Sequence, residues 1–239
     1  MTVKAVFFDA GETLIHRNPS LATITHRYLL NAGKKVNRAK LNQVLSHSAF
    51  DMKEIVQKAE LNDTEKWHVY MDSVLKRLGI KDNELKNRVI SRLKRGTSFR
   101  VYDEVWGVLK GLKKAGIKTG IISNAPKDLK KVFDRLGLTK QFDWIVVSED
   151  AGAEKPDKKI YELALKKCGI DRKNIIYVGD NYLADIMGAL KSGIRPVWLL
   201  RETKDAQFTY KTGKVPDGVA VIKSLREINR VIRQYGGLK

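Results

Sequence analysis

Residues 3–14 read Val-Lys-Ala-Val-Phe-Phe-Asp-Ala-Gly-Glu-Thr-Leu, and this stretch decides the fold. The run up to Phe8 is short and almost wholly apolar, which is typical of a strand that is buried on both faces. It ends in Asp9, whose carboxylate leaves the strand into a turn of small residues. Because burying an unpaired charge costs free energy, a carboxylate at this point indicates a functional site.

After residue 100 the sequence alternates between short apolar runs and helical patterns. This alternation predicts strands and then helices at residues 117–123, 144–148, 175–179, 196–200 and 219–222, and at 127–136, 157–167, 183–191 and beyond the last strand. Short apolar strands joined by helices predict a parallel sheet covered on both faces. With residues 3–8 they predict an α/β fold with a doubly wound, Rossmann-like core.

Residues 19–96 carry a helical pattern throughout, which predicts three to four helices and no strand. Asn18-Pro19 is expected to cap and open the first of these helices. Further starts and stops are expected at Asn37, at Asn62 or Asp63, and at Gly33, Gly79 and Gly96. We therefore expect a core of residues 1–16 and 97–239, with an all-helical cap, residues 17–96, inserted after the first strand.

Polar residues follow the predicted strands of the core. They are Asp9, Ser123-Asn124, Lys155, and the pair Asp180 and Asp185. Each has an ordinary explanation when it is taken alone, since Ser, Asn and Asp cap helices well and most lysines are solvated. The carboxyl ends of parallel strands, however, meet at one edge of a sheet, where ligands of doubly wound folds bind. We therefore expect these side chains to form one site.

The chemistry of this set is that of metal-assisted phosphoryl transfer. Asp9 and Asp180 would hold a hard cation such as Mg²⁺ through oxygen ligands. Lys155 and the Ser123 hydroxyl would bind the phosphoryl oxygens that are not transferred. Asp9 would attack phosphorus and form an aspartyl-phosphate that water then hydrolyses.

Four motifs in this order resemble those of the haloacid dehalogenase-like hydrolases, in the subfamily with a helical cap after the first motif. They are Asp9 to Thr13, Ser123-Asn124, Lys155-Pro156-Asp157, and Gly179-Asp180 through Asp185. The resemblance implies a hydrolase in which Asp9 is the nucleophile and Ser123 and Lys155 are catalytic. It implies phosphate binding by Ser123, Asn124 and Lys155, and Mg²⁺ binding by Asp9, the backbone carbonyl of Gly11, Asp180 and Asp185.

The reaction depends on two of these positions. Gly179-Asp180 resembles the acidic, magnesium-binding form of the fourth motif, whereas the family's dehalogenases resemble one another in having Ser-Asn there. Gly11, in contrast, stands where phosphatases of the family have an aspartate that serves as general acid and base. The resemblance therefore implies a phosphatase for a small phosphate monoester. The loss of acid–base help, typically worth ~10²–10⁴ in rate, would permit a slow phosphatase or one restricted to good leaving groups. Glu12 could replace the missing group, or it could face solvent or cap the backbone.

Three other functions stay open. A 2-haloacid dehalogenase would need no metal, and a phosphonate hydrolase would use a cap lysine, for which Lys53 is one candidate. The third is a non-catalytic phosphate-binding or scaffold protein. A site that has lost its catalytic function, however, has no physical need for buried carboxylates beside a lysine. The substrate itself is set by the cap, and His16, Arg17 and Arg100 lie near its expected hinges.

Composition restricts the partners. The 46 Lys and Arg against 27 Asp and Glu give a formal charge of +19, spread along the 239 residues without a nucleic-acid motif. We interpret it as a lysine-rich solvated surface and expect a small phosphorylated, anionic substrate rather than nucleic acid. No apolar run is long enough for a membrane span, so no membrane partner is expected. The single cysteine, Cys168, fits a reducing compartment, so a cytoplasmic protein is expected. We expect it to be a monomer or a homodimer.

Overall fold

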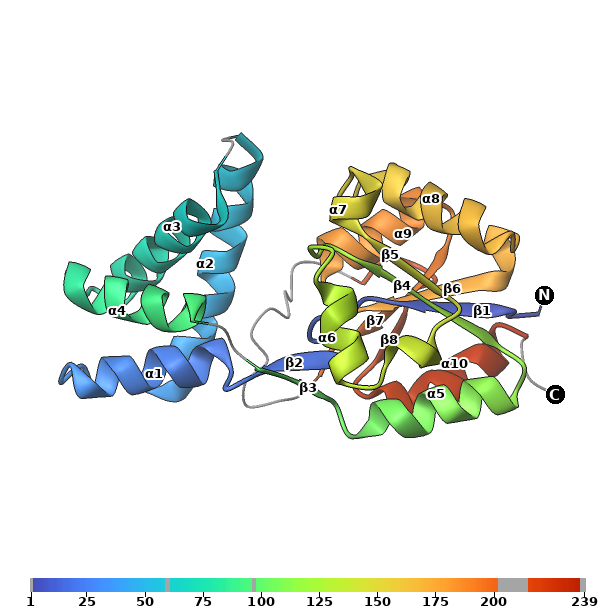
Figure 1. Cartoon of the computed structure of the whole chain (residues 1–239), viewed down its shortest axis with the longest axis horizontal. Coiled ribbons are helices and arrows are strands. Elements are labelled where there is room, and N and C mark those ends of the chain that lie inside the picture. Colours follow the sequence, from blue (N-terminus) through green and yellow to red (C-terminus); the bar gives the residue numbers. More distant parts are fainter. Residues whose placement is uncertain (1, 59–60, 96–97, 202–214, 237–239) are drawn as a thin grey trace. The chain divides into compact units, whose positions relative to one another are not determined.

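The computed structural model describes residues 2–58, 61–95, 98–201 and 215–236, except for the side chains of residues 50–58 and 63. The chain divides into two compact units, with divisions between His16 and Arg17 and between Ser98 and Phe99. The first unit contains a parallel sheet, and the second contains four helices (Figure 1). Within the described residues, no helix is both long and apolar enough to cross a membrane.

The sheet of the first unit has six parallel strands in the order β5-β4-β1-β6-β7-β8. Their bounds are Ala5–Phe8 (β1), Lys118–Ser123 (β4), Trp144–Val147 (β5), Ile175–Gly179 (β6), Arg195–Leu199 (β7) and Ala220–Ile222 (β8). Phe8 pairs with Ile121 of β4 and with Val178 of β6. The residues that follow these three strands therefore emerge side by side at one edge of the sheet.

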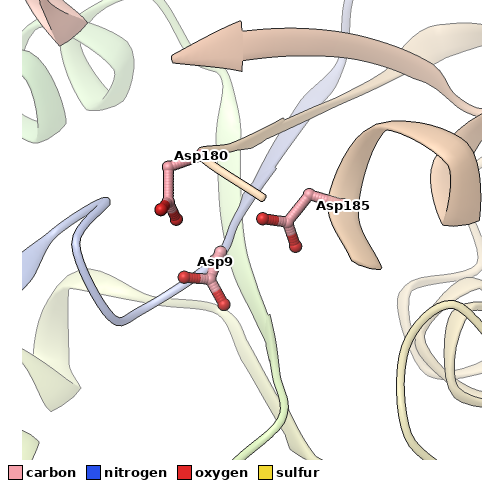
Figure 2. Close-up of side chains that lie close together, drawn as sticks. All are labelled: Asp9, Asp180 and Asp185. Carbon is pink, nitrogen blue, oxygen red and sulfur yellow. The ribbon is translucent and has the colours of Figure 1, made fainter. Parts of the chain in front are cut away.

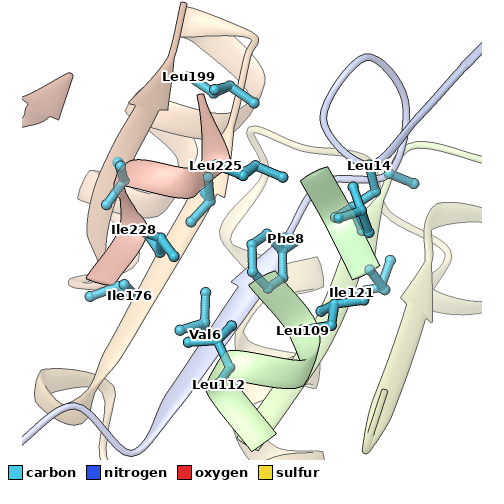
Figure 3. Packing of buried hydrophobic residues seen from close by; sticks show 14 of the residues in the cluster. Val6, Phe8, Leu14, Leu109, Leu112, Ile121, Ile176, Leu199, Leu225 and Ile228 are labelled. Carbon is cyan, nitrogen blue, oxygen red and sulfur yellow. The ribbon is translucent and has the colours of Figure 1, made fainter. Parts of the chain in front are cut away.

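Successive residues of β1 point to opposite faces of the sheet, and each face has its own apolar core. Val6 and Phe8 pack with α5 (Glu104–Lys114), α6 (Leu129–Arg135), η4 (Leu225–Glu227) and α10 (Ile228–Gln234), as Figure 3 shows in part. Ala5 and Phe7 pack with α8 (Lys158–Cys168) and α9 (Gly188–Lys191) on the other face. Helices on both faces of a parallel sheet confirm the predicted doubly wound fold.

Short helical segments complete the first unit. They are α7 (Ser148–Ala151), η1 (Thr139–Gln141), η2 (Arg172–Asn174) and the π-helix η3 (Tyr182–Met187). The helix predicted at residues 183–191 is therefore two pieces, because η3 precedes α9. The side chain of Asn181 accepts hydrogen bonds from the N–H groups of Leu183 and Ala184 and so caps η3.

The second unit consists of α1 (Leu21–Asn31), α2 (Arg38–Lys58), α3 (Asp63–Arg77) and α4 (Asn83–Lys94). Asn62 caps α3 with a capping box to Glu65, and Gly33 and Gly79 follow the ends of α1 and α3. The expected stop at Gly96 lies outside the described residues.

The predicted start of the first helix at Asn18-Pro19 is wrong. Ser20 is the N-cap of α1, and its hydroxyl accepts a hydrogen bond from the N–H of Thr23 at 3.1 Å. Asn18 instead ends β2 (Ile15–Asn18), which pairs with β3 (Ser98–Val101) in a two-stranded sheet that the sequence did not indicate. Asn and Ser are nearly equal as caps, so their identity alone could not choose between positions 18 and 20.

Candidate active site

Asp9 follows β1 directly and lies at the centre of the candidate site. Its N–H donates to the carbonyl of Val178 in the neighbouring strand at 2.9 Å, which extends the β1–β6 pairing by one residue. Its side chain is 11% exposed. Oδ1 accepts a hydrogen bond from Lys155 Nζ at 2.7 Å and a longer one from Ser123 Oγ at 3.4 Å. Two of the three predicted catalytic side chains therefore contact the third.

Lys155 is held at both its backbone and its ammonium group. Its backbone N–H donates to Asn124 Oδ1 at 2.7 Å, and Asn124 Nδ2 donates to its carbonyl at 2.9 Å. Its Nζ donates to Asp9 Oδ1 at 2.7 Å, to Asp185 Oδ1 at 2.6 Å and to Tyr177 Oη at 2.8 Å. The side-chain amide of Asn124 thus binds the lysine backbone through Oδ1 and one N–H of Nδ2, so the second N–H of Nδ2 and the backbone N–H of Asn124 are the donors for the predicted phosphate contact.

Asp180 and Asp185 come from the end of β6 and from η3. Trp198 Nε1 donates to the backbone carbonyl of Asp180 at 3.0 Å, and Thr13 Oγ1 donates to its Oδ1 at 3.3 Å. Asp185 Oδ2 accepts from the N–H of Asn181 at 2.9 Å. The Asp185 carboxyl group lies close to the backbone of Gly179, and only glycine permits this, because a Cβ there would lie 2.4 Å from the carboxyl carbon of Asp185.

The three carboxylates form one buried cluster. Each of Asp9, Asp180 and Asp185 offers an oxygen within 4.8 Å of the others, and Figure 2 shows the three side chains close together. Burial raises the pKa of Asp9 to about 6, although Lys155 beside it acts to lower it. Burial, and then the charges of Asp9 and Asp185, raise the pKa of Asp180 well above its usual value. Burial alone would lower the pKa of Lys155, but Asp185 and Asp9 outweigh it and raise that pKa.

The cluster fits a hard divalent cation. Its donors are carboxylate oxygens, which Mg²⁺ and Ca²⁺ prefer. Three carboxylates face one ammonium, so the fully ionised cluster carries an excess of two negative charges that a divalent ion would balance. Asp9, Asp180 and Asp185 are the side chains that could hold such an ion.

The turn after Asp9 shows what Gly11 and Glu12 do. Gly11 is exposed, and nothing lies within 4 Å of the position that a Cβ would take there. Glu12 is half-buried with a φ of 56°, and its Oε2 accepts a hydrogen bond from Tyr102 Oη at 2.9 Å. The Glu12 carboxylate therefore binds the Tyr102 hydroxyl, a partner that the sequence did not indicate.

The order of strands and motifs is shared with a known family. A sequence model described as haloacid dehalogenase-like hydrolase matches residues 6–199, which include Asp9, Ser123, Lys155, Asp180 and Asp185. The chain belongs to the haloacid dehalogenase-like hydrolases. This confirms the resemblance drawn from the four motifs, and it makes the protein a hydrolase.

Relatives of this hydrolase include different activities. The glyceraldehyde 3-phosphate phosphatase of Methanopyrus kandleri is 29% identical over 97% of this chain and 98% of its own. The HAD-hydrolase YfnB of Bacillus subtilis, solved bound to magnesium, is 18% identical with a TM-score of 0.70, over 97% and 99% of the two chains. The L-2-haloacid dehalogenase RSc1362 is 21% identical with a TM-score of 0.68, over 98% and 100%. These two structures show the shared fold.

Some site residues of this hydrolase escaped the sequence analysis. Tyr177 contacts both Lys155 and Asp185, and Arg201 donates to the carbonyls of Glu12 and Thr13 at 3.3 and 2.8 Å. The Arg201 guanidinium also lies 3.9 Å from the ring centre of Tyr102. Arg201 follows the end of β7 closely, so the strand-end argument could have found it. Tyr177 lies inside β6, where an aromatic residue is ordinary and carries no signal.

The structure places the three expected hinge residues in different surroundings. The ring of His16 packs against that of Tyr102 with centres 4.6 Å apart, which places it beside the Glu12 turn. Arg100 is exposed on β3, and Arg17 is half-buried on β2. The side chain of Lys53 lies outside the described part of the chain.

Proposed function

We propose that this hydrolase is a magnesium-dependent phosphatase that acts on a small phosphate monoester through an aspartyl-phosphate on Asp9. The observation that carries the proposal is the buried cluster of Asp9, Asp180 and Asp185 around Lys155 at the carboxyl end of the sheet. Buried like charges destabilise a fold, and such clusters concentrate where an ion or a reaction needs them. A relative named as a phosphatase, 29% identical over almost the whole chain, supports the same class of substrate.

Asp9 is suited to nucleophilic attack. Its Oδ1 is tied to Lys155 and Ser123, which leaves Oδ2 to form the bond to phosphorus while the ester oxygen departs. With a pKa raised to about 6 by burial, the Asp9 carboxyl is largely ionised at pH 7 and above. Water then attacks phosphorus, the bond between Asp9 and phosphorus breaks, and phosphate and the free carboxylate are released.

The other residues bind charge. Lys155, the Ser123 hydroxyl and the N–H of Asn124 would bind the phosphoryl oxygens, on which negative charge accumulates during transfer. Asp9, Asp180, Asp185 and the carbonyl of Gly11 would hold Mg²⁺. When bound, that ion would neutralise phosphate charge, so that an anionic carboxylate can approach.

Acid–base catalysis is the weak part of this site. Gly11 has no side chain to protonate the leaving oxygen, and the Glu12 carboxylate already accepts a hydrogen bond from Tyr102. We therefore propose a slow enzyme, or one that favours substrates with good leaving groups. We also propose that residues 17–96 are the cap domain of a core formed by residues 1–16 and 97–239, and that this cap selects the substrate.

The alternatives differ in their need for a cation. A dehalogenase would leave Asp180 without a counter-ion, and its raised pKa reflects the burial and the neighbouring charges that such an ion would offset. A scaffold protein would gain nothing from three buried carboxylates that destabilise one another. Nothing in the described residues favours a phosphonate hydrolase, whose cap lysine would have to be identified first.

A hydrolysis screen with and without Mg²⁺ tests the proposal. The substrates are phosphate monoesters, phosphonates and 2-haloacids, and the variant is Asp9→Asn, with exposed Asp171→Asn as its matched control. We expect phosphate release that requires Mg²⁺, disappears in Asp9→Asn and persists in Asp171→Asn. Halide release without metal would establish dehalogenase activity instead, and silence on every substrate would favour the scaffold.

A further inference from the structure

Tyr177 is a fully buried tyrosine in β6 whose hydroxyl lies among the charged groups of the site. Its Oη accepts a hydrogen bond from Lys155 Nζ at 2.8 Å. The same oxygen lies 3.0 Å from Asp185 Oδ1 and 2.9 Å from the carbonyl oxygen of Ile122, so its single proton is donated to one of these two acceptors. The Tyr177 hydroxyl therefore lies between the lysine, Asp185 and β4, the strand beyond β1 in the sheet.

The Lys155 ammonium has three N–H groups and three partners. They are Asp9 Oδ1, Asp185 Oδ1 and Tyr177 Oη, at distances between 2.6 and 2.8 Å. Two of these partners are carboxylates and one is a neutral hydroxyl. The lysine side chain is 2% exposed, so water has little room to replace any of the three.

The three partners behave differently during the proposed reaction. Asp9 loses its negative charge when its carboxylate becomes an acyl phosphate, so its hydrogen bond with Lys155 weakens at that step. Asp185 also faces the candidate cation site. The Tyr177 oxygen can accept the Lys155 hydrogen bond whichever of Ile122 and Asp185 receives its proton, and it takes no part in charge transfer, so its bond to Lys155 can persist through both half-reactions.

We propose that Tyr177 is a positioning residue that keeps the Lys155 ammonium directed at the phosphoryl group after Asp9 has been phosphorylated. This inference rests on the proposed phosphatase function. It concerns a residue outside all four sequence motifs, and the hydroxyl, rather than the ring, performs the role.

Tyr161 provides a matched control. It is also fully buried on the same face of the sheet, and its ring meets that of Tyr177 edge-on with centres 5.5 Å apart. Its hydroxyl donates to the carbonyl of Ala184 at 2.7 Å instead of contacting Lys155. Tyr161→Phe therefore removes an equally buried hydroxyl beside the site and leaves the bonds of the lysine in place.

The experiment compares Tyr177→Phe, Tyr161→Phe and the unmodified protein in two assays. The first measures hydrolysis of p-nitrophenyl phosphate with Mg²⁺. The second measures, without substrate, how fast acetic anhydride labels Lys155, read by peptide mass spectrometry. For Tyr177→Phe we expect kcat to fall about tenfold with little change in KM, since one hydrogen bond to a charged group is lost. Lys155 labelling should rise severalfold, and Tyr161→Phe should stay within about twofold in both assays, because it breaks no contact of the ammonium.

Each outcome decides one question. Equal behaviour of the two phenylalanine variants in kcat and labelling would overturn the role of Tyr177 and leave the phosphatase intact. An unmodified protein that hydrolyses no phosphate ester would overturn the proposed function, and the labelling rates would still decide whether Tyr177 holds Lys155. If Tyr177→Phe does not fold, 4-methylphenylalanine and 4-aminophenylalanine at position 177 replace it. Only the amino group can restore the hydrogen bond, so only that protein should recover kcat.

Discussion

Gly11 is the residue that limits the proposed chemistry. It lies two residues after Asp9, where the turn is exposed and a Cβ would meet nothing within 4 Å. Its φ is not among the positive values of the chain, so an L side chain can adopt this backbone without strain. The neighbouring Glu12 does have a positive φ, and its carboxylate is bound by Tyr102. Position 11 therefore has room for an acidic side chain that glycine does not supply.

Replacing Gly11 by aspartate should raise phosphatase turnover. The added carboxyl would protonate the leaving oxygen and later deprotonate water, help that is worth roughly 10²–10⁴ in rate when ideally placed. We expect a gain in kcat of about tenfold or more, largest for substrates with poor leaving groups, measured by steady-state kinetics with Mg²⁺. Gly11→Asn has the same size without the acid and should give no gain. An equal gain from both variants would contradict the explanation.

The polar residues of the site could be predicted from the sequence because each one lies at or after the end of a strand. Asp9, Ser123, Lys155, Asp180 and Asp185 were all expected at one edge of the sheet, and the structure brings them together. Tyr177 could not be found in this way, since its role depends on contacts with residues 22 and 55 positions away in the chain. Tyr102 meets Glu12 across 90 positions, so local patterns carry no trace of that bond either.

At the scale of elements, the strands were easier to predict than the helices. The five predicted strands after residue 100 agree with β4 to β8 within one residue at each end, because apolar runs in a covered sheet have sharp limits. The single helix predicted at residues 183–191 is instead the π-helix η3 followed by α9. Because π-helices are rare, the sequence pattern alone favours one α-helix there. Strands β2 and β3 were not predicted, because each is four residues long and carries polar side chains.

Glu104, at the start of α5, joins three elements of the first unit. Its carboxylate accepts hydrogen bonds from Arg201 after β7, from the Ser224 hydroxyl and from the N–H of Leu225 in η4. Burial tends to raise the pKa of Glu104, but the bonds from Ser224 and Arg201 outweigh it and lower that pKa. A carboxyl whose pKa is lowered by folding stabilises the protein above its unfolded pKa, and this stabilisation is lost as pH falls through the folded value.

Glu104→Gln should therefore destabilise the protein in a pH-dependent way. We expect a loss of about 1–3 kcal/mol at pH 7, because charged hydrogen bonds inside the fold are weakened, and a smaller loss below pH 4. Urea unfolding at both pH values measures it. Glu162→Gln is the matched control, since Glu162 also pairs with an arginine, Arg172, but its side chain is 47% exposed against 9% for Glu104. It should cost at most about 1 kcal/mol. A pH-independent loss in Glu104→Gln would contradict the assignment.

The whole molecule combines a basic composition with an acidic site. The formal charge is +19, yet the described site places three buried carboxylates against one lysine. Without a cation these carboxylates repel one another and destabilise the first unit, as the raised pKa values of Asp9 and Asp180 reflect, burial being their first cause. The fold would then gain stability when a cation binds, because a ligand that binds only the folded state shifts the unfolding equilibrium.

Thermal unfolding should show this coupling between the site and the fold. At a Mg²⁺ concentration of about 100 times Kd, binding adds about 2.7 kcal/mol, which corresponds to a rise of roughly 5–10 °C in Tm. Asp180→Asn removes one of the repelling charges, so it should raise Tm without Mg²⁺ and abolish most of the further rise with it. Asp171 is exposed and caps η2, so Asp171→Asn should change neither value. Two results would show that the cluster is not a cation site. One is an unmodified protein whose Tm does not change with Mg²⁺, and the other is an Asp180→Asn variant whose Tm without the metal is lower than that of the unmodified protein.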